Sequence, residues 1–410
     1  MVDIKINIRR LNHMLQQLSL IGKDERGGIT RLAGTDADKE ARDLVVNWMK
    51  EEALIIHFDR IGNIIAVRDG IENSKPVMTG SHIDTVVSGG MYDGCYGVLA
   101  GLEVIKTLNE FNIKTRHPIA LAVFTNEEGI RYTPDMMGSL VFSGGLKAEK
   151  AMKSIGVDGS ILENELKKIG YMGNLQDGAL IPSNYVELHI EQGPILEMKG
   201  LNIGVVENLQ GISWKEIILT GESNHAGTTP LIYRKDAGLA AAKIINYLSD
   251  LCSSVGGSQV ATCGKVIFEP NVINVVPGKV KMTIDLRNSS EEGLKQAESL
   301  LHGFLEQLAE HASIDIKINQ LVRLQPVQFD GTMTQIIERV NNRLGLTYLK
   351  MTSGAGHDAQ MMARICPSAM IFVPSVDGIS HNPNEYTFTQ DIENGANVLL
   401  NTILELSNKI

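Results

Sequence analysis

Several features that mark other classes of protein are scarce in this 410-residue sequence. Only four cysteines occur, scattered and without a Cys-x-x-Cys pair, so we expect reduced thiols in a cytoplasmic protein. No run of about 18 or more apolar residues is present, which argues against a membrane-spanning helix. The first ten residues alternate polar and apolar side chains and lack the apolar core of a signal peptide.

Positive charge and aromatic side chains are also in short supply. The 38 lysines and arginines are outnumbered by 48 aspartates and glutamates, which gives a formal net charge of −10, and aromatic residues make up 5%. A chain of this charge should be repelled by nucleic acids and by anionic membranes. There is no stripe of interleaved basic and aromatic residues, so we expect neither nucleic acid nor membrane as a partner.

Glycine, by contrast, is abundant, with 40 residues against 12 prolines. Hydrophobic residues make up 43% and charged residues 21%, which is typical of a globular protein. An excess of glycine without an excess of proline indicates many tight turns between strands and helices. The length suits two domains, because single hydrophobic cores stop growing at about 250–300 residues.

Short apolar runs alternate with helical patterns over most of the chain. This alternation predicts an α/β fold, in which helices cover both faces of a sheet. The expected buried strands are 76–79, 119–124, 184–188 and 369–373, and the clearest expected helices are 97–111 and 334–344.

Residues 211–322 follow a different pattern. Segments 214–221 and 278–287 alternate polar and apolar residues, as half-exposed antiparallel strands do, and 237–249 and 291–311 have helical periodicity. This combination predicts an inserted α+β domain of the split βαβ, ferredoxin-like type. We therefore expect a discontinuous α/β domain, residues 1–210 and 323–410, interrupted by an insert at 211–322.

Acidic residues and histidines follow the expected strands of the α/β domain. Ligands of open α/β sheets bind beyond the carboxyl ends of the strands, so a site is expected there. Taken singly, such residues are usually packed or solvated, and it is their coincidence at four strand ends that indicates a site. The residues are His82, Asp84, Asp93, Glu127, Glu128, His189 and His381.

This set suits two divalent metal ions that share a bridging carboxylate. Imidazole and carboxylate together favour zinc, with manganese or cobalt as alternatives. His82 and Asp84 are two residues apart, so an extended backbone places both on one face, where the carboxylate can orient the imidazole. Of the adjacent Glu127 and Glu128, one can ligate a metal and leave the other as a general base toward the attacking water.

Seven motifs, in order along nearly the whole chain, resemble those of the M20 metallopeptidase-like amidohydrolases. The similarity is to the branch that contains N-carbamoyl-L-amino-acid hydrolases, β-ureidopropionase and allantoate amidohydrolase. The motifs are Gly80-Ser-His-Ile-Asp-Thr-Val, Phe124-Thr-Asn-Glu-Glu-Gly-Ile-Arg-Tyr, Glu187-Leu-His-Ile-Glu-Gln-Gly-Pro, His225-Ala-Gly-Thr-Thr-Pro, Asn271-Val-Ile-Asn-Val-Val-Pro-Gly, Ser353-Gly-Ala-Gly-His-Asp-Ala and Gly378-Ile-Ser-His.

The resemblance implies a metal site and a general base. It implies Glu127 as the base, which takes a proton from the attacking water and delivers it to the leaving nitrogen. Members of the peptidase branch have a glutamate where this chain has His189, and the histidine is similar to the carbamoylase branch. The implied ligands are His82, Asp93 and His189 for one ion and Asp93, Glu128 and His381 for the other, with Asp93 bridging.

The resemblance also implies that the insert binds substrate and mediates a homodimer. Arg287 suits a substrate carboxylate, because a planar guanidinium can donate to both oxygens. His225 is the implied stabiliser of the developing oxyanion. The implied substrate-binding residues are Gln192, Asn274 and Arg287, together with Gly356 and His357 in the loop 353–358.

The implied substrate is a small ureido compound that carries a carboxylate. Allantoate-specific members tend to have an arginine where this chain has Trp214, whose indole donates one hydrogen bond and otherwise offers apolar surface. Trp214 therefore favours an N-carbamoyl-L-amino acid, although a tryptophan also suits a hydrophobic core. Allantoate amidohydrolase is the alternative function, and a dipeptidase or aminoacylase is a more distant one. A non-catalytic metal-binding protein is disfavoured, because no expected ligand or base is missing.

Overall fold

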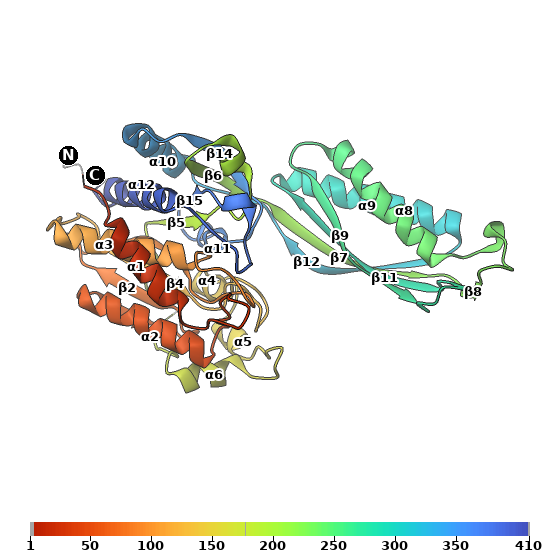
Figure 1. Cartoon of the computed structure of the whole chain (residues 1–410), viewed down its shortest axis with the longest axis horizontal. Helices are drawn as coiled ribbons and strands as arrows, with labels where there is room; N and C mark the ends of the chain where they lie inside the picture. Colours follow the sequence, from red (N-terminus) through yellow and green to blue (C-terminus); the bar gives the residue numbers. More distant parts are fainter. Residues whose placement is uncertain (1–3, 177, 409–410) are drawn as a thin grey trace. The chain divides into compact units, whose positions relative to one another are not determined.

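The computed structural model of this chain describes residues 4–176 and 178–408. Its contacts divide the chain into two compact units. The first unit combines the chain up to Glu207 with the chain from Gln328 onward, and the second comprises Asn208–Val327. Each unit has a hydrophobic core of its own. Figure 1 shows the elements of both units, coloured along the sequence.

A nine-stranded sheet forms the centre of the first unit. Its strands are β1 (Ile55–Phe58), β2 (Ile64–Arg68), β3 (Val77–His82), β4 (Ile119–Phe124), β5 (Asn184–Ile190), β6 (Ile203–Leu209), β13 (Val327–Gln328), β14 (Tyr348–Ser353) and β15 (Ser368–Val373). They lie in the order β1-β2-β4-β3-β5-β15-β6-β13, and β14 pairs with β6. The four central strands β4, β3, β5 and β15 are neighbours that run parallel.

The central strands are buried almost throughout. Every residue of β3, β4 and β15 is buried, as are all residues of β5 except the first. Strands covered on both faces need apolar side chains on both, which is why they appear in the sequence as continuous apolar runs. For the same reason, the strand expected at 119–124 coincides with β4.

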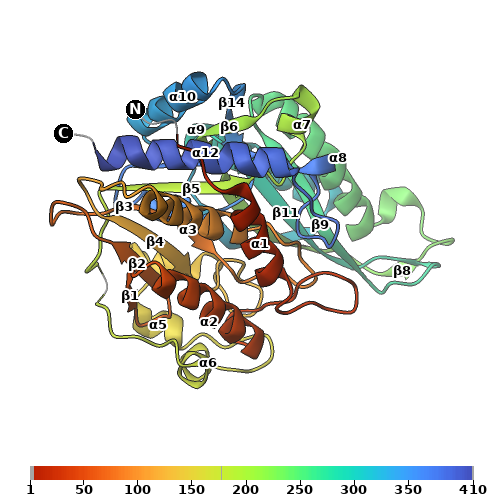
Figure 2. The ribbon, with the colours of Figure 1, turned by 60° about the vertical axis from the view of Figure 1, so that its left-hand side comes forward.

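Helices cover both faces of this sheet. Leu188 of β5 faces α12, since a side chain at Gly395 would contact it, whereas the neighbouring Glu187 accepts a hydrogen bond from Ala359 at the start of α11. Figure 2 shows α3 and α12 across one face. The helices of this unit are α1 (Ile8–Ser19), α2 (Asp36–Glu51), α3 (Cys95–Glu110), α4 (Met137–Phe142), α5 (Ala148–Met152), α6 (Leu162–Ile169), α7 (Ile195–Lys199), α10 (Gly331–Leu344), α11 (Asp358–Met362), the 3-10 helix η2 (Val376–Gly378) and α12 (Thr389–Ser407).

The start of α10 corrects the sequence-based expectation of a helix over 334–344. Asp330 accepts hydrogen bonds from the backbone N–H groups of Thr332 and Met333, each at 2.9 Å. This cap satisfies backbone donors that the first turn leaves free, so the helix begins at Gly331. Apolar periodicity reveals the middle of a helix better than its capped end.

The second unit contains a four-stranded antiparallel sheet covered by two helices. Its sheet order is β12-β7-β11-β9, and its main elements follow the sequence β-α-β-β-α-β. In Figure 1, α8 and α9 lie along one face of this sheet, where their apolar side chains form the core. The elements are β7 (Gly211–Thr220), β8 (Asn224–His225), the 3-10 helix η1 (Leu231–Tyr233), α8 (Ala237–Val255), β9 (Val260–Glu269), β10 (Val275–Val276), β11 (Lys279–Asn288), α9 (Glu291–Ala312) and β12 (Asp315–Leu324).

The end of β12 lies beyond the boundary expected between residues 322 and 323. Its pairing with β7 continues to Leu324, which lies opposite Ile212. The ladder therefore keeps these residues with the insert, and the unit extends to Val327.

The cysteines of the chain are free thiols: Cys95, Cys252, Cys263 and Cys366. None of the helices in the described part of the chain is long and apolar enough to cross a membrane.

Candidate metal centre

The candidate ligands converge because their strands are parallel neighbours. Parallel strands present their carboxyl ends at one edge of the sheet, and β4, β3, β5 and β15 are adjacent there. His82 is the last residue of β3, and His189 is the second-last residue of β5. Asp93 precedes α3, and His381 follows η2. Two groups result: His82, Asp93 and His189, and Asp93, Glu128 and His381.

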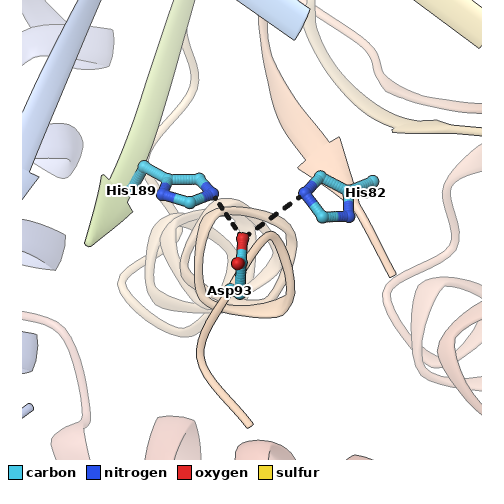
Figure 3. A group of neighbouring side chains, drawn as sticks. All are labelled: His82, Asp93 and His189. Carbon is cyan, nitrogen blue, oxygen red and sulfur yellow. Dashed lines mark ion pairs between the residues drawn. The ribbon is translucent and has the colours of Figure 1, made fainter. Parts of the chain in front are cut away.

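The first group places one carboxylate between two imidazoles. Asp93 Oδ1 lies 3.2 Å from His189 Nε2 and 3.7 Å from His82 Nε2. In Figure 3 the Asp93 carboxylate points toward both rings, which come from two different strands. All three side chains are buried. The ligand atoms within each of the two groups lie within 4.8 Å of one another.

Backbone carbonyl groups fix the orientation of both rings. His82 Nδ1 lies 2.9 Å from the carbonyl oxygen of Asp84, and His189 Nδ1 lies 2.9 Å from that of Ile190. A carbonyl oxygen can only accept, so each Nδ1 carries the proton and donates it. In the neutral rings this leaves the Nε2 lone pairs directed toward Asp93, as metal coordination requires. His189 Nε2 also accepts a hydrogen bond from Gly94 N at 3.1 Å.

The second group uses the other oxygen of Asp93. Asp93 Oδ2 lies 3.1 Å from His381 Nε2, which is also 3.6 Å from Glu128 Oε2. The His381 side chain is 51% exposed, and its backbone has a φ of 54°, a left-handed conformation that is uncommon for a residue other than glycine. One ligand group is therefore enclosed, whereas the other is open on the side of His381.

Asp84 plays a different part from the one expected from its spacing. Its carboxylate is 4.0 Å from His82 Nδ1, and it is the backbone carbonyl of Asp84 that accepts from the imidazole. The two carboxylate oxygens accept hydrogen bonds from the backbone N–H groups of Glu127 and Glu128, each at 3.2 Å. The spacing of two correctly places the side chains near each other, but β3 ends at His82, and the turn beyond it directs the carboxylate to the glutamate pair.

Glu127 lies beside the first group without belonging to it. Its Oε2 is 3.3 Å from His82 Nε2, and the residue is 8% exposed. Burial, together with the nearby charges of Asp358, Glu128 and Asp84, raises the pKa of Glu127 well above its ordinary value. A raised pKa lets a carboxylate both take and return a proton near neutrality.

The centre carries more negative charge than the protein around it balances. Burial and the charge of Asp93 raise the pKa of Glu128 well above its ordinary value. Glu128 Oε1 is buried and has no hydrogen-bond partner among the described residues. Each group offers three imidazole or carboxylate donors, the number typical of a catalytic metal site that keeps a position open. These residues therefore fit divalent cations.

The substrate-binding residues expected in the first unit also lie at this centre. The Gln192 amide donates to Asp93 Oδ2 at 2.9 Å and lies 3.4 Å from His381 Nε2. His357 is buried and packs its ring against that of His189, with centroids 4.5 Å apart. Gly356 precedes it, where an added side chain would lie 3.1 Å from Met136 Cε. His357 thus supports a candidate ligand rather than presenting an exposed side chain.

In the second unit, the structure brings His225 and Asn274 together. β8 pairs with β10, and Ala226 N donates to the carbonyl oxygen of Asn274 at 3.0 Å. His225 Nδ1 accepts from the backbone N–H groups of Gly227 and Thr228. In the neutral ring Nε2 must then carry the proton, so the exposed imidazole presents a donor, as an oxyanion stabiliser does.

Trp214 and Arg287 share the face of the second sheet that α8 and α9 leave uncovered. Trp214 pairs with Asp285, two residues before Arg287, and alternate residues of a strand share a face. Trp214 is 37% exposed and so is not a core residue. The Arg287 guanidinium donates to both oxygens of Asp285, at 3.0–3.2 Å. The fork expected to hold a substrate carboxylate therefore has a carboxylate partner within its own strand.

Two buried acids at the centre were not singled out from the sequence. Glu385 accepts hydrogen bonds from Tyr92 N and Asp93 N. Glu187 of β5 accepts from Ser81 Oγ and from Ala359 N, each at 2.7 Å. The available signals were a charge inside an apolar strand for Glu187, and a position four residues after His381 for Glu385.

Comparison with known proteins gives consistent results. A model of the peptidase family M20/M25/M40 matches residues 78–405. An N-carbamoyl-L-amino-acid amidohydrolase of Rhizobium meliloti is 38% identical, over 98% of this chain and 97% of its own length. An allantoate amidohydrolase of Bacillus subtilis is 33% identical, over 98% and 99%. The crystal structure of an amidase of the hydantoinase/carbamoylase family from Burkholderia multivorans is 41% identical and superposes with a TM-score of 0.95, over 98% of each chain.

Proposed function

Since the chain belongs to peptidase family M20/M25/M40 and is a hydrolase of amide C–N bonds, we propose that its substrate is an N-carbamoyl-L-amino acid. One molecule of this substrate and one of water give the L-amino acid, carbon dioxide and ammonia. The observation that carries the proposal is the Asp93 carboxylate, with one oxygen toward His82 and His189 and the other toward His381. The relatives named above support the choice of bond.

Two divalent cations fit the centre, with zinc first and manganese or cobalt as alternatives. His82, Asp93 and His189 would hold one, and Asp93, Glu128 and His381 the other. When bound, such cations supply Lewis acidity toward the carbamoyl oxygen and the attacking water.

The protein's own part in the reaction is proton transfer and positioning. Glu127 takes a proton from the attacking water and delivers it to the nitrogen that leaves. Asp84 holds the backbone of this glutamate in place by accepting a hydrogen bond from Glu127 N. His225 donates its Nε2 proton to the oxyanion, a role supported by the two backbone donors that occupy its Nδ1.

The remaining site residues are assigned to binding the rest of the substrate. Arg287 binds the α-carboxylate. Because Arg287 is already paired with Asp285, the substrate carboxylate must either displace Asp285 or bind Arg287 beside it. Gln192, Asn274 and the loop that contains Gly356 and His357 complete the site.

We assign the second unit as the domain that carries substrate-binding residues and forms a homodimer. Its edge strands, β9 and β12, are of the kind that can pair with another copy. Light scattering that finds only monomers contradicts the dimer.

Allantoate is the second candidate substrate, because relatives of similar identity are named allantoate amidohydrolases. Trp214 favours the first candidate. Its half-exposed indole shares a face with Arg287 and offers apolar surface where a second ureido group needs polar partners.

Product release from a panel of substrates tests the proposal, measured as ammonia for the ureido substrates and as free amino acid for N-acyl amino acids and dipeptides. The metal-loaded protein is given N-carbamoyl-L-amino acids, allantoate, N-acyl amino acids and dipeptides, each with and without a chelator. We expect the highest kcat/KM for an N-carbamoyl-L-amino acid and loss of turnover on chelation. A higher kcat/KM for allantoate selects the second candidate, and turnover that resists a chelator contradicts the metal centre.

A further inference from the structure

Glu385 lies in the turn between η2 and α12, and it connects the two loops that carry Asp93 and His381. Its Oε1 accepts hydrogen bonds from Tyr92 N at 3.0 Å and from Asp93 N at 3.1 Å. Its Oε2 accepts a hydrogen bond from Ser380 Oγ at 2.8 Å. One carboxylate thus contacts the backbone of Asp93 and the residue immediately before His381.

The burial of this carboxylate suggests a specific use. Glu385 is 5% exposed and lies among acids, so its charge is unfavourable unless its donors and nearby cations compensate. Ser380 Oγ, which donates to it, is also 3.4 Å from Asp93 Oδ2, so the same hydroxyl lies between the two carboxylates. The Ser380 hydroxyl thus links the loop of His381 to both carboxylates.

The loop before Asp93 is shaped to receive Glu385. A side chain at Gly90 would collide with Oε1 and Cβ of Glu385. Glycine at this position lets the carboxylate approach the backbone of the loop. Two of the three ligands of the first group have other supports, since the backbone carbonyls of Asp84 and Ile190 hold His82 and His189, whereas Asp93 belongs to both groups.

We propose that Glu385 is a positioning residue that sets the spacing between Asp93 and His381, and thereby the affinity of the second ligand group for a divalent cation. This inference rests on the proposed function, which places a cation in each group. Residues that orient metal ligands through hydrogen bonds typically change metal affinity by about 10–100-fold when they are replaced. The effect should be larger for the second group, because His381 belongs to that group alone whereas Asp93 is shared by both.

Titration of the metal-free protein with Co²⁺, followed by calorimetry, tests the proposal. Glu385→Asp shortens the side chain, so its two oxygens can no longer reach both loops. We expect the binding step assigned to the second ligand group to weaken by about 10–100-fold, and the step assigned to the first group to weaken clearly less. Glu385→Gln keeps the length. Its amide oxygen can accept from Tyr92 N and Asp93 N, and its NH2 can donate to Ser380 Oγ, so we expect binding close to that of the wild type.

Gly90→Ala provides an independent test, because it displaces Glu385 without altering it. It should weaken the same second step. Asp59→Asn is the matched control: Asp59 is also buried and accepts from two backbone N–H groups, those of Ile61 and Asn63, and from the Asn63 amide, but it belongs to neither ligand group. It should leave both steps unchanged.

Three results overturn the inference. One is a second step that is unaffected in Glu385→Asp, and another is equal weakening of both steps in that variant. The third is a Glu385→Gln variant as weak as Glu385→Asp, which would show that charge matters and spacing does not. A wild-type protein that binds fewer than two equivalents of Co²⁺ contradicts the two-cation proposal itself, and this inference with it.

Discussion

Glu127 and Glu128 are adjacent in the sequence, yet their carboxylates serve different neighbours. Glu127 Oε2 lies 3.3 Å from His82 Nε2, whereas Glu128 Oε2 lies 3.6 Å from His381 Nε2. Asp84 accepts from the backbone N–H groups of both, so a single carboxylate fixes the peptide from which the two side chains diverge. The proposed base and the proposed metal ligand are therefore adjacent in the chain but lie beside different histidines.

Replacing Glu127 by glutamine should separate proton transfer from metal binding. The amide cannot accept the proton of the attacking water, so we expect kcat to fall by about 10²–10⁴-fold. Metal content, measured by mass spectrometry, should persist, because Glu127 belongs to neither ligand group. Glu163→Gln, on the surface of α6, serves as a control and should leave kcat unchanged. Turnover near that of the wild type in Glu127→Gln contradicts the assignment of the base.

Asp84→Asn should lower kcat by about 10-fold or more, because the new NH2 group would face a backbone N–H that needs an acceptor. His82 should stay in place, since it donates to the Asp84 backbone carbonyl. We therefore expect the first metal-binding step, measured by titration, to be retained while kcat falls. If that step is lost instead, the carboxylate orients His82 after all.

At this scale, the sequence predicts the chemistry of the residues better than their partners. Imidazoles and carboxylates at the ends of parallel strands are expected to meet, and the five candidate ligands do. Spacing alone, however, does not say which atom of Asp84 contacts His82. Glu385 accepts from a backbone N–H 292 residues away, a contact that follows from the packing of two loops and leaves no periodic pattern.

At the scale of elements, burial decides what can be recognised in the sequence. β4, buried on both faces, appears as the apolar run 119–124, and its limits are predicted correctly. β13 and β14 join the edge region of the sheet, one with two residues and the other with mixed burial, so neither has a distinctive pattern. The family resemblance, confirmed by the comparisons, predicts the fold even where single strands have no recognisable pattern, because motifs do not depend on periodicity.

Gly94→Ala tests how closely the turn before α3 must approach β3. Gly94 has a φ of 63°, which costs an alanine about 1–2 kcal/mol, and an added side chain would collide with the ring of His82. We expect a lower free energy of unfolding and a weakened first metal-binding step. Both can be measured, by urea denaturation and by titration with Co²⁺. Binding that remains intact means the turn can yield without moving His82.

Gly303→Ala is the matched control for that substitution. Gly303 lies within α9, and an added side chain there meets no heavy atom within 4 Å. Alanine is favoured over glycine in a helix by about 0.5–1 kcal/mol, so this variant should raise the free energy of unfolding. Metal binding should not change. A destabilised protein would mean that the helix is more crowded than its contacts indicate.

At the scale of the whole molecule, each of the two units has its own hydrophobic core, so we expect the thermal stability of the two units to respond differently to metal removal. Cations that bind only the native first unit stabilise it, by about 2.7 kcal/mol at a concentration near 100 times Kd. Dialysis against a chelator should therefore lower the midpoint of one calorimetric transition and leave the other in place. Two transitions that shift together contradict independent stabilisation, and no shift contradicts metal binding.

The position of β15 imposes an order on biosynthesis. This strand lies between β5 and β6 in the sheet, but it belongs to the last part of the chain, as does His381. A ribosome therefore releases His82, Asp93 and His189 long before the middle of the sheet can close. All three ligands of the first group have emerged by then, whereas the second group is complete only when His381 follows, after almost all of the chain. Cation loading during synthesis is thus expected to proceed in two stages.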